Sequence, residues 1–322
     1  MNKREYLLAA GILSFLLWGM FQSKHHEKVK VDMDRRSFLQ VIGSAATGIA
    51  GSMAAPMVSH AQSKTEDKEF YGILVDTTRC IGCRSCEVAC AEVNDLPVPD
   101  MSAVLDFTVE RETTETQWTV INRYETEKGQ VYVPKRCMHC NQAACVAACL
   151  VKAMEKRKSG HVTWDTNCMG CRLCMVSCPF DIPKFEYNSA LPKIQKCTLC
   201  WDRFKDGKLP GCVEACPTEA LIFGTRRQLL EEAKRRIYQN PGKYNSHIYG
   251  EHEAGGTSHL YLSSVPFDQI GFRSDIGNTP YPEFSKGFLY AVPFVFVLWP
   301  VIMLGMNRAI KGNEKTINEG QE

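Results

Sequence analysis

The sequence predicts the α+β fold class, with two similar small units, an insertion and one carboxyl-terminal transmembrane helix. Three observations lead to this prediction. Sixteen cysteines fall into four groups with nearly the same internal spacing. Short runs of strand length lie between these groups, and a charge-free run of helix length lies near the carboxyl terminus.

The four cysteine groups share one pattern, and we call them runs one to four. Runs one and three read CxxCxxCxxxC, the bacterial ferredoxin spacing for iron–sulfur clusters. Run two widens the middle gap to four residues, run four widens it to eleven, and all four end in CxxxC. The runs are Cys80, Cys83, Cys86 and Cys90; Cys137, Cys140, Cys145 and Cys149; Cys168, Cys171, Cys174 and Cys178; and Cys197, Cys200, Cys212 and Cys216.

This spacing predicts how the thiolates are shared. A tight loop can bring the first three cysteines of a run around one cluster. The fourth cysteine follows after three further residues, where we expect the start of a helix, and binds the other cluster of a pair. Two runs therefore make one ferredoxin-like unit with two clusters. Four runs predict two such units and four 4Fe-4S clusters, with all sixteen cysteines as iron ligands.

Zinc sites and disulfides are the alternatives. Structural zinc would use two CxxC pairs per ion, and the third cysteine of CxxCxxC would be surplus to a tetrahedral site. A disulfide framework suits an even cysteine count in an exported chain, but CxxC neighbours pair poorly as staples, and the repeat would have no explanation. A three-iron cluster is also open, although every ligand position is a cysteine.

Composition agrees with a folded protein of moderate size. Hydrophobic residues make up 44% of the 322 residues and charged residues 23%, which allows two domains plus terminal segments. The net charge is only +2, and basic residues exceed acidic ones mainly in the first 61 residues. A nucleic-acid partner is therefore not expected.

Residues 1–61 are predicted to be a leader with a twin-arginine signal peptide. Arg35 and Arg36 precede a weakly apolar stretch at 41–55 and small residues at the two cleavage positions, Ser59 and Ala61. Export through this route carries a folded protein, so clusters assembled in the cytoplasm would cross intact. A threaded unfolded chain would instead present bare thiols to an oxidising compartment.

A second apolar run, at 6–21, lies upstream of that signal. It has sixteen residues, which is short for a membrane span of about 20 residues. It could be an extra anchor, a second signal-like segment, or leader sequence translated upstream of the true start. We favour a true start at Met33, because this start leaves an ordinary signal peptide of 29 residues.

The carboxyl-terminal end is predicted to cross the membrane once. Residues 287–306 carry no charge, and Pro293 and Pro300 are tolerated in a transmembrane helix. A buried core helix is the alternative. The basic residues Arg308, Lys311 and Lys315 follow the run, so the tail at 307–322 is expected to be cytoplasmic. The cysteine-bearing body then lies on the periplasmic face of the membrane.

Between these ends, we expect residues 62–245 to form the double ferredoxin-like domain and residues 246–286 a linker or partner-contact segment. Strand patterns lead into runs one and three, and a hairpin is expected to turn at Lys128 and Gly129. The stretch at 91–136 is too long for a simple connection and predicts an insertion that covers a cluster or meets a partner. The expected strands are 71–75, 162–164, 117–124 and 130–134, and the expected amphipathic helix is 225–238.

The order of the four runs and several short segments resemble a known family. These segments are CMHC at 137–140, KCTLC at 196–200, IFGTR at 222–226, and the glycine-containing stretches at 249–251 and 255–257. The resemblance covers about residues 69–310 and is to the four-cluster ferredoxin subunits of membrane-bound respiratory oxidoreductases. A twin-arginine signal together with a carboxyl-terminal helix is most similar to the hydrogenase-2 type. The beta subunit of periplasmic formate dehydrogenases is the near relative.

The resemblance implies an electron relay without substrate chemistry. Such subunits take electrons from the catalytic or small subunit of a periplasmic hydrogenase and pass them to a multi-spanning, quinone-reactive membrane subunit. A formate dehydrogenase, or another molybdoenzyme-type respiratory complex, is the alternative donor. One departure is visible, because the family usually has proline after the last cysteine of run two, where this chain has Leu150.

The family's ligand pattern, carried onto this chain, pairs run one with run four and run two with run three. We number the resulting ligand sets. Set one is Cys80, Cys83, Cys86 and Cys216; set two is Cys90, Cys197, Cys200 and Cys212; set three is Cys137, Cys140, Cys145 and Cys178; and set four is Cys149, Cys168, Cys171 and Cys174.

No second site competes with these cysteines. His139 lies within run two and could tune a cluster, but an ordinary loop role is the simpler interpretation. Gly250, Gly255 and Gly256 do not form a GxGxxG loop after a strand, so no nicotinamide or flavin site is predicted. A self-contained oxidoreductase would need such a site. The chain is therefore predicted to be a non-catalytic subunit.

Overall fold

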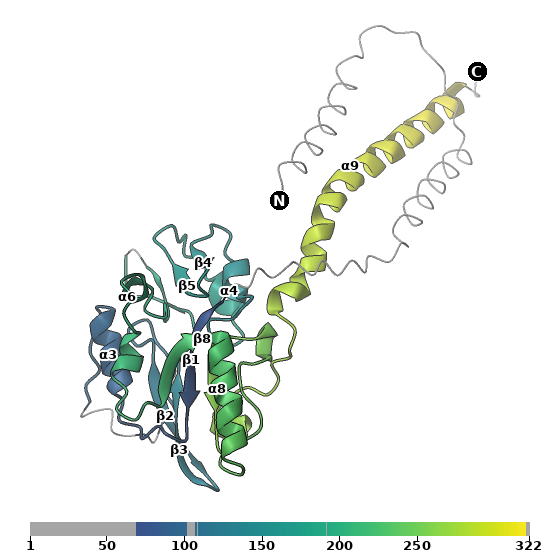
Figure 1. The fold of residues 1–322 in the computed structure, drawn as a ribbon. Coiled ribbons are helices and arrows are strands. Elements are labelled where there is room, and N and C mark those ends of the chain that lie inside the picture. Colours follow the sequence, from purple (N-terminus) through teal and green to yellow (C-terminus); the bar gives the residue numbers. More distant parts are fainter. Residues whose placement is uncertain (1–68, 102–106, 108, 191, 320–322) are drawn as a thin grey trace. The chain divides into compact units, whose positions relative to one another are not determined.

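The computed structural model describes residues 69–101, 107, 109–190 and 192–319 (Figure 1). All sixteen cysteines lie within this part of the chain. The predicted leader, with its twin arginines, its upstream apolar run and Met33, lies outside the described residues.

The largest sheet has three strands in the order β8-β1-β9. Its central strand β1 (Tyr71–Asp76) pairs antiparallel with β8 (Leu221–Thr225) and parallel with β9 (His259–Leu262). Both faces of β1 are covered, which explains the continuous apolar run of Ile73, Leu74 and Val75. Position 72 requires glycine for a steric reason, because a Cβ atom there would lie 1.7 Å from the carbonyl oxygen of Ser258.

Strand β9 corrects the expected linker at 246–286. All four of its residues are buried, and it pairs with the central strand of the sheet. The same segment adds two short 3₁₀ helices, η1 (Glu253–Gly255) and η2 (Phe267–Ile270). It belongs to the core because Tyr249, Tyr261 and Phe267 pack in the main hydrophobic cluster.

The four cysteine runs lie on two structural units that are nested in the chain. Runs one and four flank the main sheet, where helix α3 (Ser85–Val93) contacts α7 (Gly211–Glu214). Runs two and three lie between them in sequence and form a second unit, grouped apart from α3 in Figure 1. This unit contains α4 (Ala144–Ala147), α5 (Leu173–Val176) and the antiparallel pair β4 (Met154–Lys156) and β5 (Val162–Trp164).

Three further short elements follow run three. Strands β6 (Lys184–Phe185) and β7 (Ile194–Gln195) pair antiparallel. Helix α6 (Trp201–Lys205) begins directly after Cys200, the second cysteine of run four. In the sequence, these elements connect the unit of runs two and three with strand β8 of the main sheet.

The predicted hairpin is confirmed. Strands β2 (Val120–Thr126) and β3 (Gly129–Lys135) pair antiparallel, and Gly129 turns with a φ of 100°. The first strand begins at residue 120 rather than 117. Its start is delayed by a tight turn, in which the Thr114 hydroxyl accepts a hydrogen bond from the Gln117 amide at 3.0 Å.

The predicted amphipathic helix is also confirmed as α8 (Arg226–Gln239). Thr225 caps it, because its hydroxyl accepts from the Gln228 amide while the Gln228 side chain accepts from the Thr225 amide. Leu229 and Ala233 are buried on the face that contacts the main sheet, and Figure 1 shows the helix lying alongside β1 and β8.

Helix α9 (Tyr281–Glu319) contains the predicted transmembrane run. A stretch of 28 residues, Tyr281–Arg308, is long and apolar enough to cross a membrane, and Pro293 and Pro300 both lie inside the helix. The helix extends beyond the predicted limits of 287 and 306. The prediction used the absence of charged residues, which marks only the part of a helix that can lie in the hydrocarbon core of a membrane. The backbone hydrogen bonds of the helix continue beyond that part into polar residues.

A buried carboxylate fastens the segment before β2 to helix α3. Glu87 is 3% exposed and accepts hydrogen bonds from Arg84 at 2.8 Å, Arg111 at 2.6 Å and the Ile121 amide at 2.6 Å. The two guanidinium groups and the amide satisfy a charge that would otherwise be costly to bury. Glu87 therefore ties run one to the hairpin.

We expect the substitution Glu87→Gln to destabilise the folded protein because it leaves two arginines with an uncharged partner in a buried site. The loss of a charged partner in such a site lowers the unfolding temperature by roughly 10 °C. Glu112→Gln is the matched control, since Glu112 pairs with Lys135 at a half-exposed position and its loss costs only about 1 kcal/mol or less. Thermal unfolding followed by circular dichroism measures both. Equal shifts in the two variants would contradict this role of Glu87.

Candidate iron–sulfur cluster sites

The cysteine loops of runs one and three have the same backbone shape. Gly82 and Arg84 have φ values of 72° and 63°, and the equivalent Gly170 and Arg172 have values of 74° and 61°. Glycine adopts this left-handed conformation without strain, and the arginine adopts it at the helix N-cap. Each loop therefore coils back within a few residues, which turns its cysteines toward a common centre.

The position of the short helices corrects one sequence expectation. We expected the fourth cysteine of each run at the start of a helix. Instead, the third cysteine lies inside the helix, as Cys86, Cys145, Cys174 and Cys212 do. The fourth cysteine comes four residues later, about one helical turn or 6 Å along α3 in run one, and two residues beyond the end of the helix in the other three runs. This step carries the fourth thiol away from its own loop and toward the neighbouring set.

Two of the four ligand sets surround cavities directly. All four cysteines of set two line one cavity, together with Trp118, Thr119 and Leu199. All four cysteines of set four line another, together with Trp164, Met169 and Ile194. Neither cavity is lined by a cysteine of any other set.

For the other two sets, electrostatic interactions indicate which thiols are neighbours. The charge of Cys80 interacts with those of Cys216 and Cys83, and Cys86 interacts with Cys212 of set two as well as with Cys80. Cys140 interacts with Cys178, Cys137 and Cys145. The structure thus brings together cysteines that are up to 136 positions apart in the sequence, as Cys80 and Cys216 are.

The sixteen cysteines are all free, and no disulfide joins any of them. Among the described residues, no three histidine, cysteine or acidic side chains lie close enough to hold a single metal ion. In a 4Fe-4S cluster, each thiolate binds a different iron, so its four ligands stand farther apart than the ligands of one zinc ion.

The chemistry of the donor set also fits an iron–sulfur cluster. Burial and neighbouring thiols raise the pKa of Cys174 to about 11 and that of Cys90 to about 12. Burial likewise raises the pKa of Cys145 to about 12. The thiolate is the form that binds metal, so these sites need cationic partners to hold four thiolates together. Iron bound by sulfur supplies that charge.

Two buried basic side chains, Arg136 and Lys196, and the half-buried Lys156 lie among the cysteines. Arg136 donates to the sulfur of Cys212 at 3.1 Å. Lys196 donates to the carbonyl oxygens of Val162 and Cys197, and Lys156 to that of Cys140 at 2.9 Å. Sequence reasoning missed all three. Arg136 and Lys196 each precede a first cysteine, which was an available signal, whereas nothing in the sequence marks Lys156.

His139 has a structural role in the loop of run two. It is 1% exposed, its φ is 47°, and its Nδ1 accepts a hydrogen bond from the Val162 amide at 3.0 Å. Its ring stacks on that of His259, and burial lowers the pKa of both rings well below the usual value. The neutral His139 therefore joins run two to β5. Its side chain bonds to the backbone of Val162 rather than to a cysteine.

The sets differ in exposure. Every cysteine of set two is buried, whereas Cys83 of set one and Cys171 of set four are exposed. An exposed apolar residue lies two positions before each exposed cysteine, with Ile81 60% exposed before Cys83 and Met169 63% exposed before Cys171. Leu150, at the position where the family usually has proline, is 73% exposed. Sets one and four therefore reach the surface.

The fold and its cysteines define an iron–sulfur protein with paired cluster sites. Residues 79–153 and residues 129–226 each match a family model described as a 4Fe-4S dicluster domain. The chain belongs to the family of iron–sulfur electron-transfer subunits that includes the hydrogenase-2 operon protein HybA and the iron–sulfur subunits of formate dehydrogenases.

Three relatives illustrate the match. A protein of Nitratidesulfovibrio vulgaris is 48% identical over 300 residues, which cover 90% of this chain and 80% of the relative. HybA of Escherichia coli O157:H7 is 36% identical over 275 residues, 74% of this chain and 83% of the relative. The nitrate-inducible formate dehydrogenase iron–sulfur subunit of Escherichia coli K12 is 36% identical over 264 residues, 76% of this chain and 89% of the relative.

We expect the substitution Cys216→Ser to disturb the cluster of Cys80, Cys83 and Cys86, because Cys216 faces Cys80 across the first site. Iron should fall from about sixteen atoms per chain toward about twelve, with the signals of sets three and four retained. Electron paramagnetic resonance and iron analysis measure this outcome. Cys178→Ser is the matched control at the same position of run three, and it should disturb set three instead. Selective loss of a set-three signal in Cys216→Ser would show that the pairing is wrong.

Proposed function

We propose that this chain holds four 4Fe-4S clusters and relays electrons between the catalytic part of a periplasmic hydrogenase and a quinone-reactive membrane subunit. The observation that carries this proposal is the grouping of the cysteines. Sets two and four each line a cavity of their own, and the thiols of sets one and three face one another. Bound clusters would supply one-electron carriers at these positions.

The chain's own residues link neighbouring sets. Helix α3 carries Cys86 of set one and Cys90 of set two one turn apart, whereas α7 carries Cys212 and ends two residues before Cys216. Sets three and four are joined in a similar way, since α4 and α5 carry Cys145 and Cys174 and end two residues before Cys149 and Cys178. Sets two and three meet where Cys197 faces Cys137. These links favour a relay in the order one, two, three, four, with no catalytic residue in this chain.

Sets one and four, at the two ends of this relay, each contain an exposed cysteine. Cys83 and Cys171 are open to solvent, and each lies beside an exposed apolar side chain of the same loop. Apolar surface next to a redox site favours docking of another subunit, because association removes that surface from water. We propose that one end takes electrons from the catalytic partner and that the other passes them to the membrane subunit.

A hydrogenase donor is favoured by the similarity to HybA and by the twin arginines of this sequence. A formate dehydrogenase, or another molybdoenzyme-type respiratory complex, is the second candidate, because identity to a formate dehydrogenase iron–sulfur subunit is also 36%. The catalytic subunit that co-purifies from detergent-solubilised membranes decides between them.

We propose that the body lies on the periplasmic face of the cytoplasmic membrane, exported by the twin-arginine route and held by one carboxyl-terminal anchor. Helix α9 supports the anchor, since an 18-residue window in it has a mean hydropathy of 2.2. The basic residues Arg308, Lys311 and Lys315 after the apolar run favour a cytoplasmic tail.

Removal of residues 281–322 tests the anchor. The truncated protein should be soluble and keep its clusters, because every cysteine lies at or before Cys216. Quinone reduction by the complex should fall roughly tenfold or more, since docking loses the high effective concentration that an anchor provides. Reduction of an artificial dye by the donor should change little, because that reaction needs no quinone. Full quinone reduction in the truncated protein would show that the helix is dispensable.

Changing Arg35 and Arg36 together to lysine tests export. We expect folded precursor with its clusters in the cytoplasm, because a receptor reads this signal as an address. Cell fractionation with detection of the precursor measures the outcome. Arg4→Lys is the control in the upstream segment and should leave export unchanged. Normal processing of the double variant would indicate that the apolar run at 6–21 directs export and would contradict a start at Met33.

A further inference from the structure

Arg136 is a fully buried charge between two of the cysteine sets. It follows strand β3 and is 2% exposed. Its Nη1 donates to the sulfur of Cys212, a member of set two, at 3.1 Å. Cys86 of set one lies on α3, which contacts α7, the helix that carries Cys212, and both cysteines belong to one buried cluster. One guanidinium therefore lies close to both sets held by runs one and four.

Protein groups leave this charge without a carboxylate partner. Within the described part of the chain, no ion pair includes Arg136, and its Nε and Nη2 have no hydrogen-bond acceptor. Burial of an unpaired guanidinium is unfavourable. The backbone just before Arg136 is held in place, because the Tyr261 hydroxyl donates to the carbonyl oxygen of Pro134 near the end of β3 at 2.9 Å.

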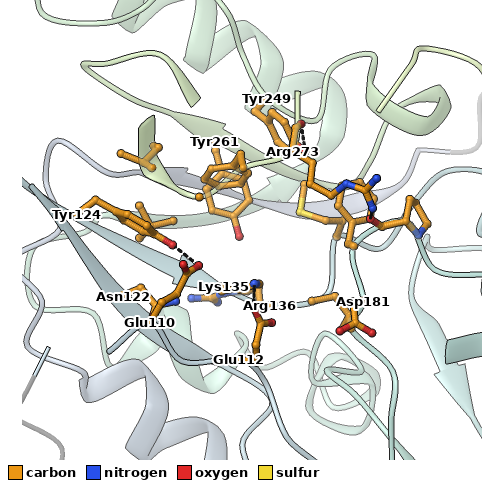
Figure 2. A pocket seen from close by; sticks show the side chains of 18 residues that line it. Glu110, Glu112, Asn122, Tyr124, Lys135, Arg136, Asp181, Tyr249, Tyr261 and Arg273 are labelled. Atoms are coloured by element: carbon orange, nitrogen blue, oxygen red, sulfur yellow. Dashed lines mark hydrogen bonds and ion pairs between the residues drawn. The ribbon is translucent and has the colours of Figure 1, made fainter. Parts of the chain in front are cut away.

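The acidic side chains of a neighbouring pocket are engaged with other partners. Arg136 lines this pocket of about 340 Å³, shown in Figure 2. In it, Glu110 accepts from the Tyr124 hydroxyl at 2.6 Å, Glu112 pairs with Lys135 at 2.5 Å, and Asp181 pairs with Lys184 at 2.8 Å. The acids of the pocket therefore do not neutralise Arg136, and its charge acts on the cysteine side.

The short contact between Arg136 and Cys212 points the same way. The guanidinium and the sulfur lie 3.1 Å apart in a buried site, where little water screens the attraction between opposite charges. By the same attraction, the arginine favours any additional negative charge on a cluster held beside it.

We infer that Arg136 raises the reduction potentials of the two clusters held by sets one and two, so that one residue tunes both. This inference rests on the proposed cluster assignment. Reduction adds one electron to a cluster and increases its negative charge, and a nearby fixed positive charge stabilises the reduced form more than the oxidised form. Arg136 exchanges no electron itself and acts on the clusters only through its charge.

The surroundings of the other sets give a contrast. Lys156 donates to the carbonyl oxygens of Cys140 and His139, and the thiols of set three interact with its charge. Arg172 lines the cavity of set four. Its guanidinium lies over the rings of Phe185 and Tyr187 rather than on a cysteine sulfur. Loss of the Arg136 charge should therefore affect sets one and two alone.

The test uses the full-length protein with its clusters and the variant Arg136→Met, which removes the charge and keeps an unbranched side chain. In redox titrations followed by electron paramagnetic resonance, the ratio of reduced to oxidised cluster at a fixed potential should fall by about tenfold for sets one and two. That change corresponds to about 59 mV for a one-electron couple. The signals are assigned with Cys216→Ser and Cys178→Ser. The signals of sets three and four should not move.

Two further variants complete the test. Arg136→Lys keeps the charge and should titrate near the wild type, whereas Lys156→Met removes a different buried charge and should shift set three only. Iron content is measured throughout. Fully loaded Arg136→Met with unchanged titrations would overturn the inference, as would equal shifts in all four sets.

The inference can also be tested if a variant loses iron. If Arg136→Met loses its clusters, Arg136→Gln keeps hydrogen-bond donors without the charge, and wild-type potentials in that loaded variant would overturn the inference. Loss of clusters from the Met, Gln and Lys variants alike would show that Arg136 builds the site rather than tunes it, which also overturns the inference. A wild-type protein without about sixteen irons would instead contradict the proposed function itself.

Discussion

The step of four residues between the third and fourth cysteine of each run is the constraint on which the rest of this structure depends. The third thiol lies in a short helix, and the fourth lies in the same helix in run one and two residues beyond its end in the other runs, so the two thiols reach different sites. The left-handed residues Arg84 and Arg172 start helices α3 and α5 directly before the third cysteine. Each helix thereby belongs to two sites at once, and moving it would disturb both.

This sharing explains why the runs are nested in the chain. A set needs three cysteines from one run and the fourth from another, so the two contributing helices must lie side by side. Helix α3 contacts α7, and α4 contacts α5. Runs two and three are close in sequence and can meet through short strands. Runs one and four are far apart, and the main sheet brings them together by pairing β1 with β8.

Buried charge is the second requirement of such a protein. Sixteen thiols in a small body form sites that attract positive charge, and the chain places Arg136, Lys156 and Lys196 among them. Charged groups away from the cysteines are paired within the protein, as Glu87 is by Arg84 and Arg111. The relatives include subunits of hydrogenase-2 and formate dehydrogenase systems.

The sequence by itself determined the kind of protein, because the residues that define it are local in the chain. Spacing within a run depends on a few consecutive residues, so the runs, the strand at β1, the hairpin and helix α8 could all be predicted. The apolar run of α9 was equally visible, although its helical ends were not. Only the tertiary structure decided which residues from distant segments meet. It placed β9 in the main sheet, made Arg136 face both Cys86 and Cys212, and left Cys83 and Cys171 exposed. Burial and charge compensation depend on packing between such segments, and local sequence patterns carry no record of it.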